Sequence, residues 1–399
     1  MPRILHINAT ANWGSTGRIA EQLCDIVKAS GWDCFIAYGR HANVSNHNLI
    51  KVGNRGSVYV HYIANRVLDN EGLSSCLATK RLVRKIKQIS PDIIHLHNLH
   101  DHWINYKILF EYLNSTEIPV VWTQHDCWAF TGGCAHYALN SCMKWQSNCD
   151  QCSYKRSIYD AAARNFLLKK KLFLANKNLT IVPVSCWLRD EISKSFLKKN
   201  NIQTIYNGVD TNIFKYKDGV FVRKKYGLRD KFVILGVASA WSDKKGFKDY
   251  ISLSKILPDD CVIVMVGLPA KQIASLPKNI IGIERTNNVE ELVELYSMAD
   301  VVLNLSYQES FGLTTVEGMA CGTPSIVYNV TASPELVTKE TGVVVSKGDI
   351  EGVLSAVHEI KAQGKEHYFT ACCQRATSLF DKDKCYDDYM KLYQSLLSN

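Results

Sequence analysis

Two glutamates eight positions apart, Glu309 and Glu317, are the strongest candidates for chemistry in this sequence. Glu309 follows a short apolar run that is predicted to be a buried strand. It is therefore expected in a loop at the carboxyl edge of a sheet, where α/β proteins bind ligands. The amides of Phe311, Gly312 and Leu313 open a predicted helix, and a helix N-terminus attracts phosphate. One carboxylate could bind sugar hydroxyls and the other a ribose diol. Taken alone, two glutamates at this spacing are more often solvated helix positions.

A glycine loop and a histidine stand at the ends of two other predicted strands. Gly14-Ser15-Thr16-Gly17 follows the apolar run Arg3–Ala9, and helical spacing begins directly after it. This order of strand, glycine loop and helix occurs at phosphate sites and also in plain strand–helix turns. His125 follows the predicted strand Val120–Thr123, at an end where a ligand site is expected. A lone histidine, however, is usually a satisfied structural residue.

A metal site is predicted in the polar, turn-rich stretch 127–156. This stretch holds four cysteines in the pattern Cys-x7-Cys-x6-Cys-x2-Cys, namely Cys134, Cys142, Cys149 and Cys152. Four thiolates suit tetrahedral zinc, and a structural zinc would stabilise a segment with few long aliphatic side chains. The spacing is not that of a standard zinc finger, so reduced thiols and disulfides remain as alternatives. A weaker metal candidate is the alternating set His95, His97 and His100.

Short apolar runs alternate with segments of helical spacing along the whole chain. This alternation predicts parallel sheets that are covered by helices on both faces. The predicted strands are 3–9, 34–38, 93–96, 120–123 and 181–184 in the first half, and 232–238, 262–266, 301–305 and 324–328 in the second. The predicted helices include 82–89, 106–113, 247–257, 289–298, 312–321 and 350–361.

The simplest domain organisation is two α/β domains in tandem. The first spans 1–206 and contains the cysteine-rich insertion near 127–156, and the second spans 207–380. A C-terminal helix, 381–399, is expected to pack back on the first domain. Its apolar and aromatic residues fall on one helical face: Tyr386, Tyr389, Met390, Tyr393 and Leu397.

Composition and charge narrow the class of protein. The chain has 399 residues, 46% apolar and 21% charged, as in a globular protein of two or three domains. No run of about 18 apolar residues occurs and the first residues do not resemble a signal peptide, so we expect a cytoplasmic protein. The cysteines outside 127–156 are then expected as thiols or metal ligands. Residues 1–206 hold 25 Lys and Arg against 14 Asp and Glu, whereas residues 207–399 hold 22 against 24.

The basic first half predicts an anionic partner: a membrane surface, nucleic acid or an anionic substrate. Lysine and arginine gather in runs at 80–87, 169–171 and 194–199. Phenylalanine and leucine flank the middle run, which favours either a basic amphipathic helix on an anionic membrane or a solvated helix face. No recognised nucleic-acid module accompanies the charge, so we expect no nucleic-acid partner.

In combination, the motifs resemble those of the retaining glycosyltransferases of family 4. That family has the GT-B fold, in which two Rossmann-like parallel-sheet domains face a cleft. The string from Glu309 to Glu317, followed by Met319-Ala-Cys-Gly-Thr-Pro324, is the most specific part of the resemblance. The resemblance extends over essentially the whole chain. Within the family, the sequence resembles the subgroup that builds capsular, colanic-acid-like and O-antigen polysaccharides. Four further segments match family motifs in order: Asp92–Asn98, Gln124–Asp126, Pro183–Trp187 and Tyr206–Asp210.

The resemblance implies roles for the residues of the second domain. Glu309 holds the donor sugar, Glu317 the ribose, and Lys245 the diphosphate, where it neutralises charge on the leaving nucleotide. The family commonly has an arginine near position 241, where this sequence has Trp241. Lys244 or an arginine of the first domain is the expected replacement.

The resemblance also implies roles for the first domain. His125 is expected near the reacting carbon of the sugar, where it positions and stabilises rather than acting as a base. The loop from Gly14 to Gly17 is expected to line the donor phosphates or the acceptor. No metal is expected in catalysis, because lysine and helix amides neutralise the phosphate charge.

We therefore expect a retaining hexosyltransferase that moves a sugar from a nucleotide sugar to a lipid-linked glycan in surface polysaccharide synthesis. Peripheral attachment to the inner face of the plasma membrane, through the basic first domain, is part of this expectation. Two alternatives remain. One is a catalytically inactive nucleotide-sugar-binding subunit, prompted by Trp241, and the other is a nucleotide-sugar epimerase with the same fold.

Overall fold

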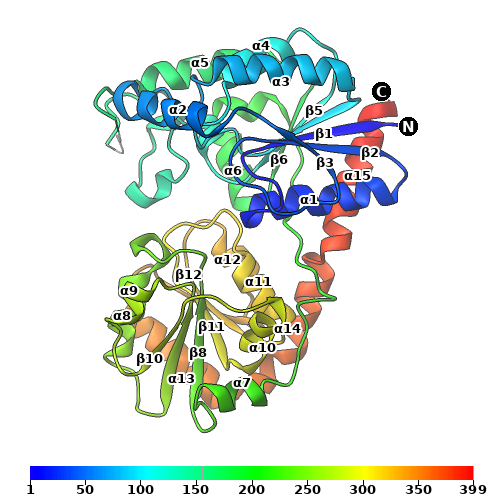
Figure 1. Cartoon of the computed structure of the whole chain (residues 1–399). Helices are drawn as coiled ribbons and strands as arrows, with labels where there is room; N and C mark the ends of the chain where they lie inside the picture. The colour runs from blue at the N-terminus through cyan, green and yellow to red at the C-terminus, as the bar shows by residue number, and fades with distance from the viewer. Residues whose placement is uncertain (154–156, 399) are drawn as a thin grey trace. The chain divides into compact units, whose positions relative to one another are not determined.

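The computed structural model describes residues 1–153 and 157–398 and divides into two compact units. The first unit consists of Met1–Ile205 and Tyr386–Asn399, and the second of Tyr206–Cys385. Each unit contains one parallel sheet with helices on both faces (Figure 1). The prediction of two Rossmann-like α/β domains is confirmed.

The sheet of the first unit has seven strands in the order β3-β2-β1-β4-β5-β6-β7. All its pairings are parallel, and the central strands β5 and β6 are buried along their whole length. The strands are β1 (Arg3–Asn8), β2 (Asp33–Tyr38), β3 (Asn48–Lys51), β4 (Ile93–Leu96), β5 (Val120–Gln124), β6 (Leu179–Pro183) and β7 (Asn201–Ile202).

Helices cover both faces of this sheet, with α3, α4 and α5 on one face and α1, α6 and α15 on the other (Figure 1). Polar caps fix several helix starts, because they satisfy amides that have no partner within the helix. Asn54 and Ser57 form a capping box at α2, and Ser185 accepts the amide of Leu188 at α6. The helices are α1 (Gly14–Ala29), α2 (Arg55–Leu68), α3 (Cys76–Ile89), α4 (Tyr106–Leu113), α5 (Ala162–Leu174), α6 (Cys186–Lys194) and α15 (Lys382–Ser398).

The C-terminal helix α15 lies against the first sheet through tyrosine hydroxyls. The hydroxyl of Tyr393 lies 2.6 Å from Nδ1 of His95, and that of Tyr389 lies 2.9 Å from Oγ1 of Thr123. Tyr386 donates a hydrogen bond of 2.9 Å to Gln22 of α1. The buried polar groups of the sheet are thus satisfied by the helix that covers them.

The sheet of the second unit has six parallel strands in the order β10-β9-β8-β11-β12-β13. Its central strands are continuous apolar runs, and every residue of β9, Cys-Val-Ile-Val-Met-Val, is buried. The strands are β8 (Phe232–Val237), β9 (Cys261–Val266), β10 (Ile280–Ile283), β11 (Val301–Asn304), β12 (Ser325–Tyr328) and β13 (Gly342–Val345).

Helices again cover both faces, with α10 and α11 on one and α8 and α13 on the other (Figure 1). The side chains of α10, including Tyr296 and Met298, form one apolar core with β8, β9 and β11. The helices are α7 (Val220–Lys225), α8 (Phe247–Ser254), α9 (Ala270–Ile273), α10 (Val289–Met298), α11 (Leu313–Ala320), α12 (Ser333–Leu336), α13 (Ile350–Gln363) and α14 (Lys365–Leu379).

The described part of the cysteine-rich insertion has an aromatic core. Three short 3₁₀ turns, Trp128–Phe130, Tyr137–Asn140 and Lys144–Gln146, run through it. The ring of Trp145 is buried and lies 5.0 Å from the rings of both Phe130 and Tyr137. Aromatic rings thus provide buried apolar area in a stretch that has few long aliphatic side chains.

Lys169 of α5 joins this insertion to the body of the first unit. Its ammonium group is buried and donates to the carbonyls of Trp128 at 2.7 Å and Thr131 at 3.2 Å. The group also lies 3.4 Å from the centre of the Trp128 ring. The basic run at 169–171 was expected to face a membrane or solvent, and for Lys169 that expectation was wrong. The flanking Phe166, Leu172 and Phe173 are buried as well.

The stability of the first unit should depend on pH through Lys169. Burial lowers the pKa of Lys169 to about 7, so above that pH the unfolded chain binds a proton that the folded chain lacks. Stability therefore rises with pH towards the ordinary lysine pKa. Relative to Lys169→Met, the wild type should gain about 1 kcal/mol between pH 7 and pH 8. Urea unfolding at the two values measures it. The exposed neighbour Lys170→Met is the control, and an equal slope in both variants would contradict the assignment.

Cys24 was expected to be a thiol or a metal ligand, and the structure corrects this. Cys24 of α1 and Cys34 of β2 form a disulfide with their Cα atoms 5.5 Å apart. The helix packs directly on the neighbouring strand, which brings the two residues into the range that a disulfide requires. The described thiols of Cys261 and Cys321 are buried and unbridged.

Candidate functional site

The predicted site residues of the second unit gather at the carboxyl ends of β8 and β11. These two strands are neighbours in the sheet, so the loops that follow them meet at one edge. The loop after β8 leads into the turn Asp243–Lys245 and helix α8, and the loop after β11 leads into α11. The amide of Tyr307 donates to the carbonyl of Lys244 at 2.8 Å, which ties the two loops together.

Lys245 and Glu309 form an ion pair across these loops. Nζ of Lys245 lies 2.5 Å from Oε1 of Glu309, and the two side chains are 37% and 15% exposed. The backbone of Glu309 is fixed on both sides: its amide donates to Oγ1 of Thr331 at 2.9 Å, and its carbonyl accepts from Ala332 at 3.2 Å. Two residues predicted to act on adjacent parts of one ligand are thus in direct contact.

Two glycines permit the close approach of these loops. Gly246 has a φ of +72°, and a Cβ there would lie 2.4 Å from the carbonyl oxygen of Leu305. Gly312, at the start of α11, has a φ of +109°, which side chains disfavour. Helix α11 then begins at Leu313, with Gly312 as its N-cap residue. Phe311 is buried, with Tyr206 and Phe380 as ring neighbours.

Glu317 is oriented by a residue that the sequence analysis missed. Oε2 of Glu317 accepts a hydrogen bond of 2.7 Å from the hydroxyl of Tyr296, which is buried in α10. Burial and the adjacent carboxylate raise the pKa of Tyr296 well above its ordinary value, so the hydroxyl remains a donor. The pattern of α10 marks Tyr296 as a core residue, and only the packing of α10 on α11 shows its polar contact.

Trp241 has a structural role in the second unit. Its side chain is buried, and its Nε1 donates to the carbonyl of Val266 at 2.8 Å. Its ring packs edge-on against Tyr250 at 4.9 Å. The residue at this position therefore braces β9 and α8.

The predicted residues of the first unit lie at the carboxyl edge of its own sheet. Gly14 begins α1, and Gly17 is buried in its first turn. Asn8, at the end of β1, joins the glycine loop to the segment after β4. Its side chain donates to the carbonyl of Thr10 at 2.9 Å and accepts from the amide of Asn98 at 3.2 Å.

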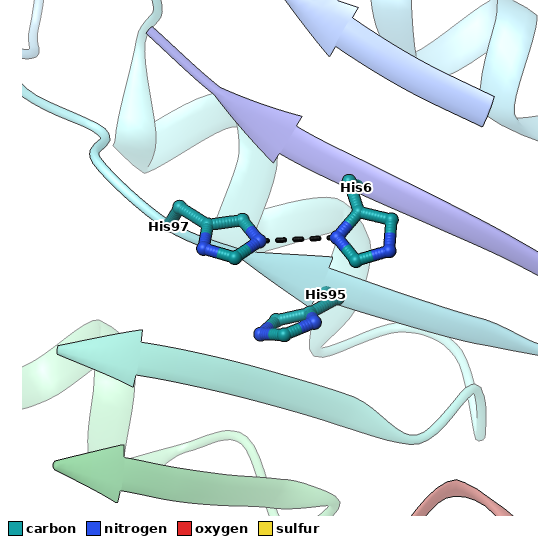
Figure 2. A group of neighbouring side chains, drawn as sticks. All are labelled: His6, His95 and His97. Atoms are coloured by element: carbon teal, nitrogen blue, oxygen red, sulfur yellow. Dashed lines mark hydrogen bonds between the residues drawn. The ribbon is translucent and has the colours of Figure 1, made fainter. Parts of the chain in front are cut away.

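His125 belongs to a cluster of histidines on one face of the first sheet. His6 of β1 pairs in register with His95 of β4, and alternation places His97 on the same face. Figure 2 shows the rings of His6, His95 and His97 gathered together, with a hydrogen bond between His6 and His97. Burial lowers the pKa of His125 to about 4, so the ring is neutral near pH 7.

His100 does not join His95 and His97 in the triad that the sequence left open. Its Nε2 lies 2.7 Å from Oδ2 of Asp126, and its Nδ1 lies 3.3 Å from Oδ1 of Asp101. Burial alone would lower the pKa of His100, but the two carboxylates outweigh it and raise the pKa well above its ordinary value. His100 and Asp126 are thus an ion pair beside the neutral cluster.

The four cysteines of the insertion do not form a compact ligand set. Among the described residues, the groups of three or more potential ligands within 4.8 Å of one another include none of Cys134, Cys142, Cys149 and Cys152. Burial raises the pKa of Cys149 to about 11, with Cys142 and Cys152 as nearby contributors. The amide of Gly132 donates to Sγ of Cys149 at 3.2 Å.

Zinc binding by this insertion remains a prediction, and it can be tested by direct measurement. Protein purified without chelator should carry about one zinc per chain, by the four-ligand stoichiometry, and Cys149→Ser should lose it. The same variant should lower the melting temperature of the first unit and leave the second unit folded. The exposed Cys76→Ser is the matched control. A metal-free protein with four titratable thiols at these positions would show that this cysteine spacing does not indicate a zinc site.

Comparisons with known proteins bear on both units. The family model "Glycosyltransferase Family 4" matches residues 16–213, and "Glycosyl transferases group 1" matches residues 221–369. An N-acetyl-alpha-D-glucosaminyl L-malate synthase of Bacillus anthracis is 28% identical over 227 residues, which cover 54% of this chain and 60% of that protein. A putative colanic acid biosynthesis glycosyl transferase of Escherichia coli, WcaC, is 23% identical over 77% of each chain.

Solved structures share the fold over the full length. A sucrose-phosphate synthase from Thermosynechococcus elongatus superposes with a TM-score of 0.74 at 16% identity, covering 100% of both chains. Anabaena HepE, solved in complex with UDP and glucose, gives a TM-score of 0.67 at 16% identity, covering 99% of this chain and 100% of its own. Within the described residues, none of the helices combines the length and the apolar character needed to cross a membrane.

Proposed function

The chain belongs to the family 4 glycosyltransferases of the GT-B fold, and from this membership we propose that it moves a sugar from a nucleotide sugar to a growing glycan. We further propose that the transferred sugar is a hexose, that the transfer retains the anomeric configuration, and that the product is a surface polysaccharide. The colanic-acid relative supports the last point.

The observation that carries the proposal is the contact between Lys245 and Glu309 at the N-terminal end of α11. A diphosphate needs a cation and helix amides, and a sugar needs a hydrogen-bond acceptor beside them. Lys245, the start of α11 and Glu309 supply these three groups at one sheet edge. A bound diphosphate would compete with Glu309 for the ammonium group of Lys245 and release the carboxylate for sugar hydroxyls.

The other site residues complete the proposed donor site. Glu317, held by Tyr296, binds the ribose diol. Lys244 and the amides of Gly312 and Leu313 support the phosphates. In the first unit His125 acts on the reacting sugar, and the loop from Gly14 to Gly17 lines the phosphates or the acceptor. We propose no metal for the reaction, since these cationic and amide groups neutralise the leaving diphosphate.

A panel of nucleotide sugars tests the proposal. Thermal shift identifies the donor that stabilises the chain, and mass spectrometry of products, with a lipid-linked oligosaccharide as acceptor, detects transfer. An increase of one hexose in the acceptor mass, with nucleoside diphosphate released, supports the proposal. Binding without transfer would favour an inactive subunit, and conversion of one nucleotide sugar into another would favour an epimerase.

A lipid-linked acceptor and an anionic membrane are the proposed partners of the first unit. Helix α2 exposes Tyr59, Val60 and Ile63 to 65%, 66% and 43%. Helix α3 carries five exposed basic residues, namely Lys80, Arg81, Arg84, Lys85 and Lys87. A peripheral membrane surface combines two features: apolar side chains that enter the bilayer, and cations that contact the lipid phosphates.

A groove beside α3 supports the same partner. It has a volume of about 530 Å³ and combines Leu49, Ile50 and Leu77 with the basic Lys51, Arg81 and Lys85. Such a lining suits the junction between a lipid chain and its phosphate, which offers apolar surface and negative charge together.

The chain should therefore bind vesicles that contain anionic lipid, and salt should weaken the binding by screening. Replacing Val60 and Ile63 together with serine should reduce co-sedimentation at both low and high salt. The double variant Val220→Ser with Phe221→Ser is the matched control, because those side chains of α7 are 64% and 73% exposed in the second unit. Equal binding to neutral vesicles would remove the electrostatic argument.

A further inference from the structure

Three histidines of the first unit form a continuous hydrogen-bonded chain that ends at His125. Nδ1 of His6 lies 3.0 Å from Nε2 of His97, as Figure 2 shows, and Nδ1 of His97 lies 3.1 Å from Nε2 of His125. His6 and His97 are 0% and 1% exposed, whereas His125 is partly exposed. Through this chain, the one ring that a ligand can reach is joined to two that it cannot.

The three rings are neutral under ordinary conditions. Burial lowers the pKa of His6 to about 3 and that of His125 to about 4, and burial together with the neighbouring histidines holds the pKa of His97 well below its ordinary value. A neutral imidazole has one N–H and one lone pair, so it donates from one nitrogen and accepts at the other.

Neutrality couples the tautomers along the chain. Each of the two contacts needs one N–H facing one lone pair. If His6 carries its proton on Nδ1, then His97 and His125 must also carry theirs on Nδ1. If His6 carries it on Nε2, all three must be Nε2–H. Any mixed arrangement sets two N–H groups or two lone pairs against each other at about 3 Å in at least one of the two contacts, and that hydrogen bond is lost.

The buried end of the chain selects between these two arrangements. Nε2 of His6 is buried and has no hydrogen-bond partner among the described residues. In the Nε2–H arrangement this atom would be a buried N–H without an acceptor, and orphaned buried N–H groups are rarer in proteins than unpaired acceptors. The Nδ1–H arrangement leaves only a lone pair there.

We propose that His6 and His97 are positioning residues that hold His125 in the Nδ1–H tautomer, so that His125 offers its ligand an N–H donor and not a lone pair. Nε2 of His125 is occupied by His97, which leaves Nδ1 as the nitrogen that can meet a ligand. The catalytic meaning rests on the proposed glycosyl transfer: such a donor can stabilise a sugar or phosphate oxygen but cannot remove a proton.

His95 lies on the same face of the first sheet but does not belong to the hydrogen-bonded chain of histidines. Its Nδ1 lies 2.6 Å from the hydroxyl of Tyr393, and its Nε2 lies 2.7 Å from Oγ1 of Thr123. Nitrogens of His6, His95 and His97 do lie within 4.8 Å of one another, an arrangement that could also hold a metal. We favour the hydrogen-bonded chain, because both nitrogens of His95 already have partners and the set includes no carboxylate to balance a dication.

The tautomer can be measured directly in the full-length chain. Nitrogen-15 NMR of histidine-labelled protein distinguishes protonated from unprotonated ring nitrogens, and His125→Gln assigns the resonance. We expect the Nδ1–H form of His125 in the wild type. In His97→Phe the donor to Nε2 is gone, and His125 should revert to the Nε2–H form that free imidazole side chains prefer. His95→Phe, the matched control, removes a buried ring from the same face of the sheet and should leave the tautomer of His125 unchanged.

Kinetics supply the second readout. His97→Phe should lower turnover about tenfold while the Kd of the nucleotide-sugar donor stays within about twofold, because the lost contact acts through the orientation of the His125 proton. An Nε2–H tautomer of His125 in the wild type would overturn the proposal, as would histidine nitrogen shifts that change when the protein is treated with EDTA. The tautomer measurement needs no donor and no activity, so its result stands apart from success or failure of the proposed function.

Discussion

Lys245→Ala should lower turnover by about 10²–10³, whereas the affinity for the nucleotide-sugar donor should fall far less. The charge on the diphosphate grows as the bond to the sugar breaks, so a cation beside it stabilises the transition state more than the ground state. The ion pair with Glu309 strengthens this asymmetry, because part of the attraction to a bound donor is offset by the loss of the pair. Steady-state kinetics with the donor from the panel, combined with calorimetry, separates the two effects.

The neighbouring lysines provide the controls for this prediction. Lys248→Ala removes an exposed cation of α8, three residues further along the chain, whose partner is Asp243, and it should leave turnover within about twofold. Lys244→Ala tests the residue expected to replace the missing arginine. Wild-type turnover in Lys245→Ala would contradict the prediction. It would mean that another cation stabilises the leaving diphosphate, with Lys244 as the first candidate.

Glu317→Ala should cost roughly 1.5–3 kcal/mol of donor binding, since a carboxylate that accepts hydrogen bonds from a ribose diol makes charge-assisted contacts. Tyr296→Phe should cost about 0.5–1.5 kcal/mol, because it removes only the hydroxyl that orients the carboxylate. Calorimetry with the matched donor measures both. Glu359→Ala, an exposed glutamate of α13, is the control. Unchanged donor affinity in a folded Glu317→Ala variant would refute the ribose assignment.

The sequence predicted the central strands of both sheets but not their edges. β8, β9 and β11 are continuous apolar runs because both of their faces are covered by helices. The strands that the pattern did not reveal, β3, β7, β10 and β13, stand at the four edges. They have two to four residues each and are partly exposed, so no apolar run distinguishes them from loops.

The parts of the candidate site that lie in one continuous stretch of sequence were predictable. The contacts that depend on how separate elements pack together were not. The string from Glu309 to Glu317 places a loop, a glycine and a helix start in order. Neither the contact of Lys245 with Glu309 nor that of Tyr296 with Glu317 follows from spacing, because each joins residues from separate strand–helix units. The burial of Lys169 could likewise not be predicted from the sequence, since a lysine in a basic run has the pattern of a surface residue.

The packing of α15 on the first unit has a consequence for biosynthesis. Residues Tyr206–Cys385, a stretch of 180 residues, separate the two chain segments that build this unit. At translation rates of about 5–20 residues per second, roughly 10–40 s pass between synthesis of β6 and synthesis of Tyr389 and Tyr393. During that interval His95 and Thr123 lack the hydroxyls that later bond to them. The second unit is therefore fully synthesised before the first unit is complete, and the first sheet must wait for α15 to satisfy these two buried polar groups.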